Sequence, residues 1–292
     1  MPTVVLDGRT VAYLEAGQGQ RAADRRATAR AAAPLLLVHG YTGSKEDFAS
    51  VLAQLGEERR AVAVDLPGHG DSQALPDPGG YGLWATAQWL LRLADVLGLG
   101  EYHLLGHSMG GLVVQRVAAA ASQRLRSLVL MDTGLAGLRQ EAAEVVARIG
   151  VAARDEGIEA AWRESRRASE RRAPRYHTSA DRDEFVRRRF LALDPAAVVV
   201  GARNLITAAP LTAFLRDIDL PVLVVHGEHD DAWTPHEQRV LARTVRGAEL
   251  AVVPDSRHSP QLENPQAWLR AVRGFLRRAE EDQQRGPRAG VG

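Results

Sequence analysis

Short apolar runs alternate with amphipathic stretches along most of the chain. The first two runs, residues 3–6 and 10–14, alternate apolar and polar side chains around an Asp-Gly dipeptide suited to a tight hairpin turn. They predict an antiparallel pair of strands. Further short apolar runs predict buried strands at residues 35–38, 61–64, 102–105, 127–131, 222–225 and 250–253.

Helical periodicity fills most of the segments between these runs. Apolar residues recur at helical spacing over residues 81–97 and again over 265–279, as expected for a helix with one buried face. Strands that alternate with helices predict an α/β fold with a mostly parallel sheet and helices on both faces. The alternation stops between residues 133 and 215, where the pattern is helical and contains no convincing strand.

That interruption predicts an insertion in the fold. We expect an α/β core made of residues 1–133 and 211–292, with residues 134–210 forming a helical cap. The cap should cover the carboxyl edge of the sheet, where open α/β folds bind ligands. Residues 17–33, rich in Ala and Arg, are predicted to be a loop or a short exposed helix. The polar, Gly-rich residues 280–292 are predicted to be a disordered tail.

Composition narrows the class of protein. Of the 292 residues 45% are hydrophobic and 25% are charged, and the formal net charge is +1, so no global attraction to nucleic acid or to an anionic membrane follows. The absence of cysteine excludes disulfides, thiolate catalysis and Cys-based zinc sites. No secretory signal and no bilayer-spanning apolar run is found, so we expect a cytoplasmic protein that binds neither nucleic acid nor membrane.

The cap region is rich in arginine. Residues 163–189 contain ten arginines and five acidic residues. One hypothesis is a site for an anionic substrate. We favour the interpretation that these charges lie on solvated helix faces and pair with one another.

The sequence G-H-S-M-G at residues 106–110 matches the pattern G-x-S-x-G. It follows one predicted strand and precedes a helix-like run, so its serine falls on a sharp strand-to-helix turn. Such a turn strains the backbone, and the glycines two residues before and after the serine relieve the crowding. The turn should expose the hydroxyl of Ser108 at the end of the sheet, and we predict that Ser108 is a nucleophile.

A serine nucleophile needs a base within hydrogen-bond reach. Among nine histidines, His258 is the candidate, because it lies in a short loop between the last predicted strand and the closing helix. Its imidazole needs a carboxylate partner to fix the tautomer and stabilise the cation. Asp230 and Asp231 both follow the strand at 222–225, so either could reach the imidazole, and we favour Asp230. Asp132 is a third candidate, for which a bond to local backbone in a turn is favoured.

The transition state of acyl transfer also needs donors for the developing oxyanion. We predict the backbone N–H groups of Met109, which follows the nucleophile, and of Tyr41, in the loop after the strand at 35–38. Gly40 would let the backbone approach the substrate closely. We expect Gly40, His107 and Trp233 to line a pocket for a small-molecule substrate, without a metal or an organic cofactor.

These motifs resemble those of the α/β-hydrolase superfamily in order and spacing. H-G-Y-T-G at 39–43, D-L-P-G-H-G-D-S at 65–72, G-E-H-D at 227–230 and R-H-S-P at 257–260 accompany the serine motif. The resemblance implies an eight-stranded, mostly parallel sheet flanked by helices, with the cap inserted after the sixth strand. It also implies a structural role for the loop that begins at Asp65, and supports Asp230 as the acid of a Ser-Asp-His triad.

We therefore expect a serine hydrolase that cleaves a small-molecule carboxylic ester or lactone through a Ser108 acyl-enzyme. A C–C bond hydrolase or a thioesterase would use the same triad, and a non-catalytic ligand-binding protein would keep the same fold. The serine at position 108 argues against the dehalogenases and epoxide hydrolases of the superfamily, which carry an aspartate there.

Overall fold

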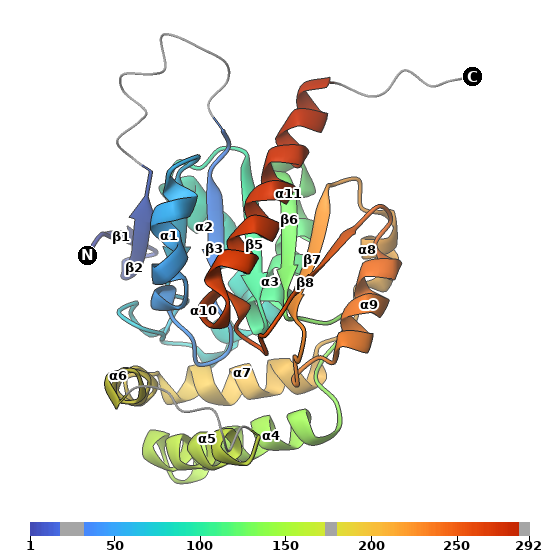
Figure 1. The fold of residues 1–292 in the computed structure, drawn as a ribbon. Helices are drawn as coiled ribbons and strands as arrows, with labels where there is room; N and C mark the ends of the chain where they lie inside the picture. The colour runs from blue at the N-terminus through green and yellow to red at the C-terminus, as the bar shows by residue number, and fades with distance from the viewer. Residues whose placement is uncertain (18–31, 173–179, 286–292) are drawn as a thin grey trace.

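A computed structural model describes residues 1–17, 32–172 and 180–285 (Figure 1). Its centre is an eight-stranded sheet with the strand order β1-β2-β4-β3-β5-β6-β7-β8. β2 pairs antiparallel with both β1 and β4, and the strands from β4 to β8 pair in parallel. The strands are β1 (Thr3–Leu6), β2 (Arg9–Ala16), β3 (Leu35–Val38), β4 (Ala61–Val64), β5 (Tyr102–His107), β6 (Leu125–Met131), β7 (Val222–Gly227) and β8 (Glu249–Val253).

Helices cover both faces of the sheet because successive side chains of a strand point to opposite faces. In β3, Leu36 and Val38 join the apolar cluster under α2, α3, α8 and α9, whereas Leu35 and Leu37 join the cluster under α1 and α11. The helices of the core are α1 (Ala49–Gly56), α2 (Leu83–Val96), α3 (Met109–Ala121), α8 (Thr212–Asp217), α9 (Pro235–Thr244), α10 (Pro260–Glu263) and α11 (Pro265–Arg285). Single 3-10 turns are η2 (Lys45–Phe48), η3 (Pro78–Tyr81) and η4 (Ser122–Arg124).

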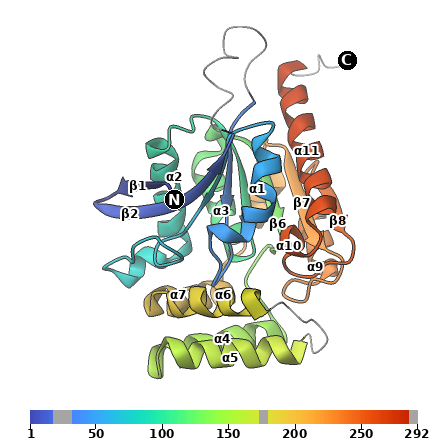
Figure 2. The same ribbon diagram turned by 60° about the vertical axis from the view of Figure 1, so that its left-hand side comes forward.

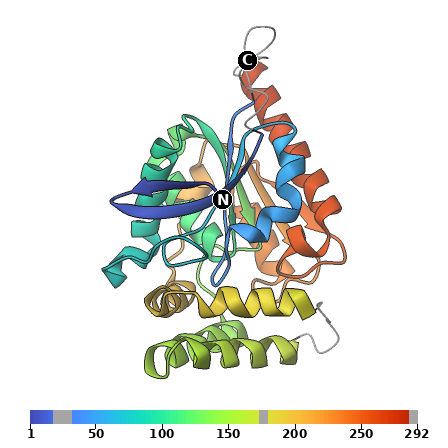
Figure 3. The same cartoon turned by 90° about the vertical axis from the view of Figure 1, so that its left-hand side faces the viewer.

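The two edges of the sheet differ from its buried centre. Figure 3 shows β1 and β2 projecting as a hairpin from one side of the molecule. At the other edge, the run at 250–253 was predicted to be buried, yet Leu250 and Val252 are 41% and 50% exposed. The prediction is wrong for these two side chains because α9, the helix on their face, packs mainly against β7 and leaves the outer strand uncovered.

The C-terminal helix is longer than its apolar stripe predicts. α11 continues to Arg285, so the predicted disordered tail is wrong for residues 280–285, and residues 286–292 lie outside the described residues. The carboxylate of Glu280 accepts hydrogen bonds from Arg59 Nη1 at 2.7 Å and from the backbone N–H of Ala33 at 3.0 Å. These two partners, which are distant in sequence, stabilise a turn of α11 whose polar sequence is typical of a disordered tail. Residues 18–31, most of the segment predicted to be a loop or exposed helix, also lie outside the described residues.

Four helices follow β6 and precede α8, where the sequence predicts the cap, and we call them the cap. They are α4 (Gln140–Asp155), α5 (Ile158–Arg172), α6 (Ala180–Leu191) and α7 (Pro195–Thr207). α6 and α7 lie next to the carboxyl ends of the parallel strands, and α4 and α5 form a second layer beyond them (Figure 2). The cap has a small apolar cluster of its own, with Val145, Ile149, Phe190 and Val198 among its members. Its boundaries as a domain stay a prediction.

Within the described ranges, no single helix has both the length and the apolar character needed to cross a membrane. One bent pair, Asp183–Leu191 with Pro195–Thr207, meets that test only when its two members are taken together across a bend of 100°.

Candidate active site

Ser108 lies on a strained turn between β5 and α3. Its backbone has φ 56° and ψ −119°, in a region that residues other than glycine rarely adopt. The surrounding backbone fixes this conformation: the Ser108 N–H donates to the Met131 carbonyl at 2.9 Å, and the Thr133 hydroxyl donates to the Ser108 carbonyl at 2.9 Å. The turn therefore holds the serine hydroxyl at the carboxyl end of the sheet.

The two glycines of the serine motif are needed for close backbone approach. A Cβ atom on Gly106 would lie 2.4 Å from the carbonyl oxygen of Gly110. A Cβ atom on Gly110 would lie 2.4 Å from the carbonyl oxygen of His39, at the end of β3. A larger residue at position 106 would push α3 away from β5, and one at position 110 would push α3 away from the end of β3.

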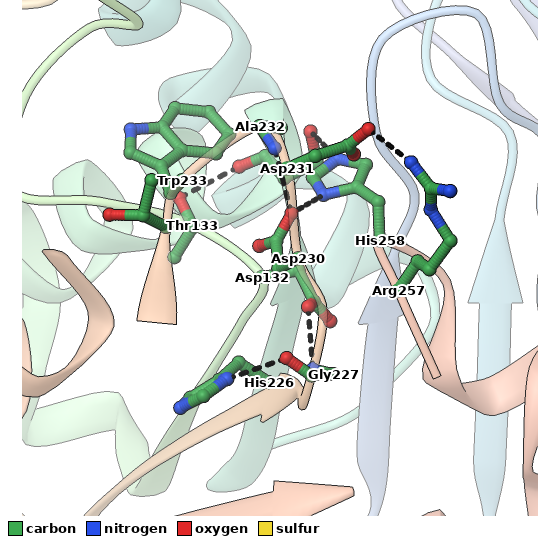
Figure 4. A network of polar contacts seen from close by, with 12 residues as sticks. Asp132, Thr133, His226, Gly227, Asp230, Asp231, Ala232, Trp233, Arg257 and His258 are labelled. Atoms are coloured by element: carbon green, nitrogen blue, oxygen red, sulfur yellow. Dashed lines mark hydrogen bonds and ion pairs between the residues drawn. The ribbon is translucent and has the colours of Figure 1, made fainter. Parts of the chain in front are cut away.

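Three side chains from separate loops form a continuous hydrogen-bonded line. The Ser108 Oγ lies 3.0 Å from His258 Nε2, and His258 Nδ1 lies 2.8 Å from Asp230 Oδ1 (Figure 4). Asp230 also accepts hydrogen bonds from the backbone N–H of Ala232 at 2.9 Å and from Gln238 Nε2 at 3.0 Å. With Nδ1–H donated to Asp230, the imidazole presents the lone pair of Nε2 to the serine hydroxyl, as a general base requires.

The charges of this line support one another. Burial favours the neutral form of Asp230, but the facing imidazole of His258 and the hydrogen-bond donors around it outweigh burial and lower its pKa. Burial likewise opposes a charged His258, but the carboxylate of Asp230 outweighs it and raises the pKa of the imidazole above its ordinary value. The pair is thus arranged to stabilise an imidazolium when the histidine takes up a proton.

The two other candidate acids occupy different places. The carboxylate of Asp231 points to Arg257, whose Nη2 lies 2.5 Å away (Figure 4). Asp132 is completely buried, and its Oδ1 accepts a hydrogen bond at 2.9 Å from the backbone N–H of Gly227, on β7. The expected bond to local turn backbone is therefore wrong, because Asp132 fastens the neighbouring strand instead.

Asp132 also faces the triad carboxylate. One oxygen of Asp132, one of Asp230 and one nitrogen of His258 lie within 4.8 Å of one another, and Asp132 Oδ2 finds no donor among the described residues. Burial and then the charge of Asp230 raise the pKa of Asp132 well above its ordinary value. The charge of Asp230 therefore disfavours ionisation of Asp132. The three atoms could in principle converge on a metal ion, but hydrogen bonds already account for their placement.

The loop after β3 approaches the serine from the other side. A Cβ atom on Gly40 would lie 2.9 Å from the Cβ of Ser108, so only glycine leaves room there. The backbone N–H groups of Tyr41 and Met109 donate no hydrogen bond to any residue in the described part of the chain. The Tyr41 hydroxyl donates to the Val198 carbonyl at 2.8 Å, which ties this loop to α7 of the cap. These positions are suitable for two oxyanion donors.

His107 supports the loop that carries His258. Its Nε2 lies 2.6 Å from the carbonyl oxygen of His258 and donates to it. Burial lowers the pKa of His107 to about 4, so the ring is neutral and its tautomer is fixed by this bond. Nothing in the sequence indicated this contact, because the two residues are 151 positions apart.

A cavity of about 840 Å³ opens between these residues and the cap. Gly40, His107 and Trp233, predicted as pocket residues, all line it together with Ser108 and His258. The Trp233 ring stacks near the His258 ring, with centroids 6.3 Å apart, and its indole N–H donates to the Ala136 carbonyl at 3.1 Å. The prediction missed the charged lining residues Asp47, Arg166, Asp183, Arg189, Arg257 and Glu263.

Known proteins resemble this chain in sequence and in fold. The sequence model of the alpha/beta hydrolase fold family matches residues 33–265. Among solved structures, an esterase from Thermogutta terrifontis is 29% identical with a TM-score of 0.75, over 95% of this chain and 97% of that one. The enol-lactonase from Burkholderia xenovorans LB400 is 26% identical with a TM-score of 0.77, over 94% of this chain and 100% of that one.

Curated relatives match to different extents. A 2-succinyl-6-hydroxy-2,4-cyclohexadiene-1-carboxylate synthase from Serratia proteamaculans is 29% identical over 83% of this chain and 92% of its own length. The dihydrolipoyllysine-residue acetyltransferase component of the acetoin cleaving system from Pseudomonas putida is 43% identical, but only over 34% of this chain and 26% of its own length. The chain thus spans about a quarter of that larger protein.

Proposed function

The chain belongs to the alpha/beta hydrolase fold family, and we propose that it is a serine hydrolase that cleaves a small-molecule carboxylic ester or lactone. The observation that carries the proposal is the hydrogen-bonded line from Ser108 through His258 to Asp230, at the wall of a cavity large enough for a small-molecule ligand. Similarity to an esterase and to an enol-lactonase supports the choice of carboxylic esters and lactones.

In the acylation step, His258 Nε2 accepts the proton of Ser108 as its Oγ attacks the carbonyl carbon of the substrate. Asp230 stabilises the imidazolium that forms. The backbone N–H groups of Tyr41 and Met109 donate to the oxyanion of the tetrahedral intermediate. His258 then gives its proton to the leaving alcohol, and Ser108 is left as an acyl ester.

In the deacylation step, His258 removes a proton from a water molecule that attacks the acyl ester. The second tetrahedral intermediate uses the same oxyanion donors. Its collapse releases the carboxylic acid and returns the proton to Ser108. Gly40 keeps space open above the serine for both intermediates.

Covalent labelling tests the proposal directly. A fluorophosphonate probe should add once per chain, and peptide mass spectrometry should place the adduct on Ser108. A Ser108→Ala variant of equal thermal stability is the matched control and should not be labelled. A folded protein that takes up no probe and hydrolyses no member of an ester and lactone panel would contradict the proposal and favour a ligand-binding protein, to be followed by thermal-shift assays.

A second candidate function is chemistry at a carbon–carbon bond on the same triad. It is supported by the similarity to a relative named as a synthase over most of both chains. A β-diketone substrate compared with simple esters separates the two candidates. Faster cleavage of the diketone would favour the second one.

A further inference from the structure

The cavity has two chemically different walls. One set of lining residues is apolar and includes Trp233, beside His258, Leu138, and Ala142, Val146 and Ile149 of α4. Residues 142, 146 and 149 are spaced by four and three positions, so they lie on one face of the helix. We call these three residues the α4 wall.

A second set of lining residues, on α5, α6 and η2, is charged, and its members pair with one another. Arg189 of α6 bonds Asp47 in η2, and Arg166 of α5 approaches Glu170 at 3.1 Å and Asp183 at 3.4 Å. All five side chains line the same cavity. An alkyl chain laid against these ion pairs would remove water from them without replacing its hydrogen bonds, which is unfavourable. An apolar part of a substrate is therefore directed to the α4 side.

We propose that the α4 wall is the binding channel for an unbranched apolar arm of the substrate, so that the preferred substrates are medium-chain aliphatic esters or lactones with an aliphatic side chain. This inference rests on the function proposed above. The seven steps from Ala142 to Ile149 rise about 10 Å along the helix axis. That length suits an arm of about eight carbons.

The small size of Ala142 keeps the channel open near its start. This side chain is buried in the apolar cluster of the core and lies on the cavity wall. A larger residue there would occupy the path of the arm beyond its first few carbons. The same helix supplies a control in Val151, which is 48% exposed and does not line the cavity.

Chain-length profiles test the channel. We would measure kcat/KM of the full chain for p-nitrophenyl esters from acetate to dodecanoate, and for acetates of alcohols of the same lengths. In at least one series, kcat/KM should rise about fourfold per methylene up to about eight carbons, which is the gain expected from burying each CH2. Ala142→Phe should lower the octanoate-to-butyrate ratio of kcat/KM at least tenfold. Val151→Phe should leave the ratio unchanged.

A second variant covers the case in which Ala142→Phe fails to fold. Val146→Thr keeps the size of a partly exposed side chain but makes the wall more polar, and it should reduce the gain per methylene. If kcat/KM does not change with chain length in either series while fluorophosphonate still labels Ser108, the proposed channel is wrong and the hydrolase function stands. Absence of both labelling and turnover would overturn the hydrolase function itself.

Discussion

Within the described residues, the molecule contains two sets of serine, histidine and carboxylate joined by hydrogen bonds. One set lies at the carboxyl ends of the parallel strands and the other at their amino ends. Besides the set that includes Ser108, the Ser127 Oγ lies 2.7 Å from His103 Nδ1, and His103 Nε2 lies 3.1 Å from Glu280 Oε1. Ser127 and His103 lie near the starts of β6 and β5, at the edge away from the cap, and pair in register. The same three functional groups thus occur twice in very different surroundings.

The two serines differ first in backbone conformation and in their accessibility to a substrate. Ser127 lies within strand β6, directly after a register shift in its pairing with β5, and both Ser127 and His103 are completely buried, so no substrate can reach the hydroxyl. Ser108 stands on a turn with positive φ and lines the cavity under the cap. A hydrogen-bonded serine and histidine is therefore a structural pair unless a strained turn exposes the hydroxyl beside oxyanion donors.

The charges differ as well. Burial lowers the pKa of His103, and the nearby guanidinium of Arg59 lowers it further although Glu280 opposes both. Arg59 takes up the charge of Glu280 through a bond of 2.7 Å. Besides His258, in contrast, the donors to Asp230 within the described residues are neutral, and Asp230 raises the pKa of that histidine. A nearby cation thus weakens the support that a carboxylate gives to a histidine base.

The largest expected effect comes from removing each serine hydroxyl. Ser108→Ala should lower kcat/KM for an ester by a factor on the order of 10⁴ to 10⁶, because the nucleophile is lost. Ser127→Ala should leave kcat/KM within about twofold and lower the free energy of unfolding by about 1 kcal/mol, the usual worth of one hydrogen bond. Steady-state kinetics and urea unfolding measure the two effects. A large loss of activity in Ser127→Ala at normal stability would refute the distinction between the two sites.

The next effect comes from the two carboxylates. Asp230→Asn should lower kcat by a factor of about 10² to 10⁴, because the amide favours the wrong tautomer of His258. Without the charge of Asp230, Asp132 ionises more readily and lies close enough to supply part of the missing charge, so adding Asp132→Asn to that variant should cost at least a further tenfold. Glu280→Gln should leave kcat unchanged and lower Tm. Equal activity of the single and double asparagine variants would show that Asp132 gives no such support.

Much of the catalytic end was predictable from sequence because its parts are local. A strand, a glycine-flanked serine and a helix within about fifteen residues specify the turn, and loops that directly follow β7 and β8 must bring Asp230 and His258 to the same edge. The parallel sheet followed from buried apolar runs in the same way. For the serine turn and for the loops after β7 and β8, the order of strands and helices along the chain is enough to predict the edge of the sheet at which they lie.

Contacts between distant segments were not predictable. The end of α11 depends on Glu280 meeting Arg59, 221 positions away, and Arg189 meets Asp47 across 142 positions. Charged side chains follow no periodic pattern from which such distant partners could be identified. The sequence therefore indicated a disordered tail and solvated helix faces. The exposed face of β8 was missed for a related reason, because an apolar run does not reveal that a strand lies at an edge.

The pH dependence of activity is the third effect. His258 acts as a base only when neutral, and Asp230 raises its pKa, so kcat/KM should fall as the pH drops through a value above the ordinary 6.5. Asp230→Asn should move this limb to lower pH by removing the charge that raises the pKa. Glu280→Gln should leave the limb in place. The pH profile of ester hydrolysis for the three proteins makes this comparison, and a limb below 6.5 in the wild type would contradict the assignment of the base.

The smallest expected effect is on stability, where the two histidines have opposite signs. The raised pKa of His258 gives stability that is present below pH 6.5 and is lost as the pH rises through its folded value. The lowered pKa of His103 gives stability that is complete above pH 6.5 and is lost as the pH falls below it. Buried His39, His69 and His107, with pKa values of about 4, 3 and 4, act in the same direction as His103. Asp132, whose pKa is also raised, acts in the same direction as His258. The four buried histidines outweigh these two groups, so Tm should fall by a few degrees between pH 7 and pH 5, and His103→Asn should reduce that slope. A Tm that rises on acidification over this range would mean that the buried histidines take up protons in the folded state.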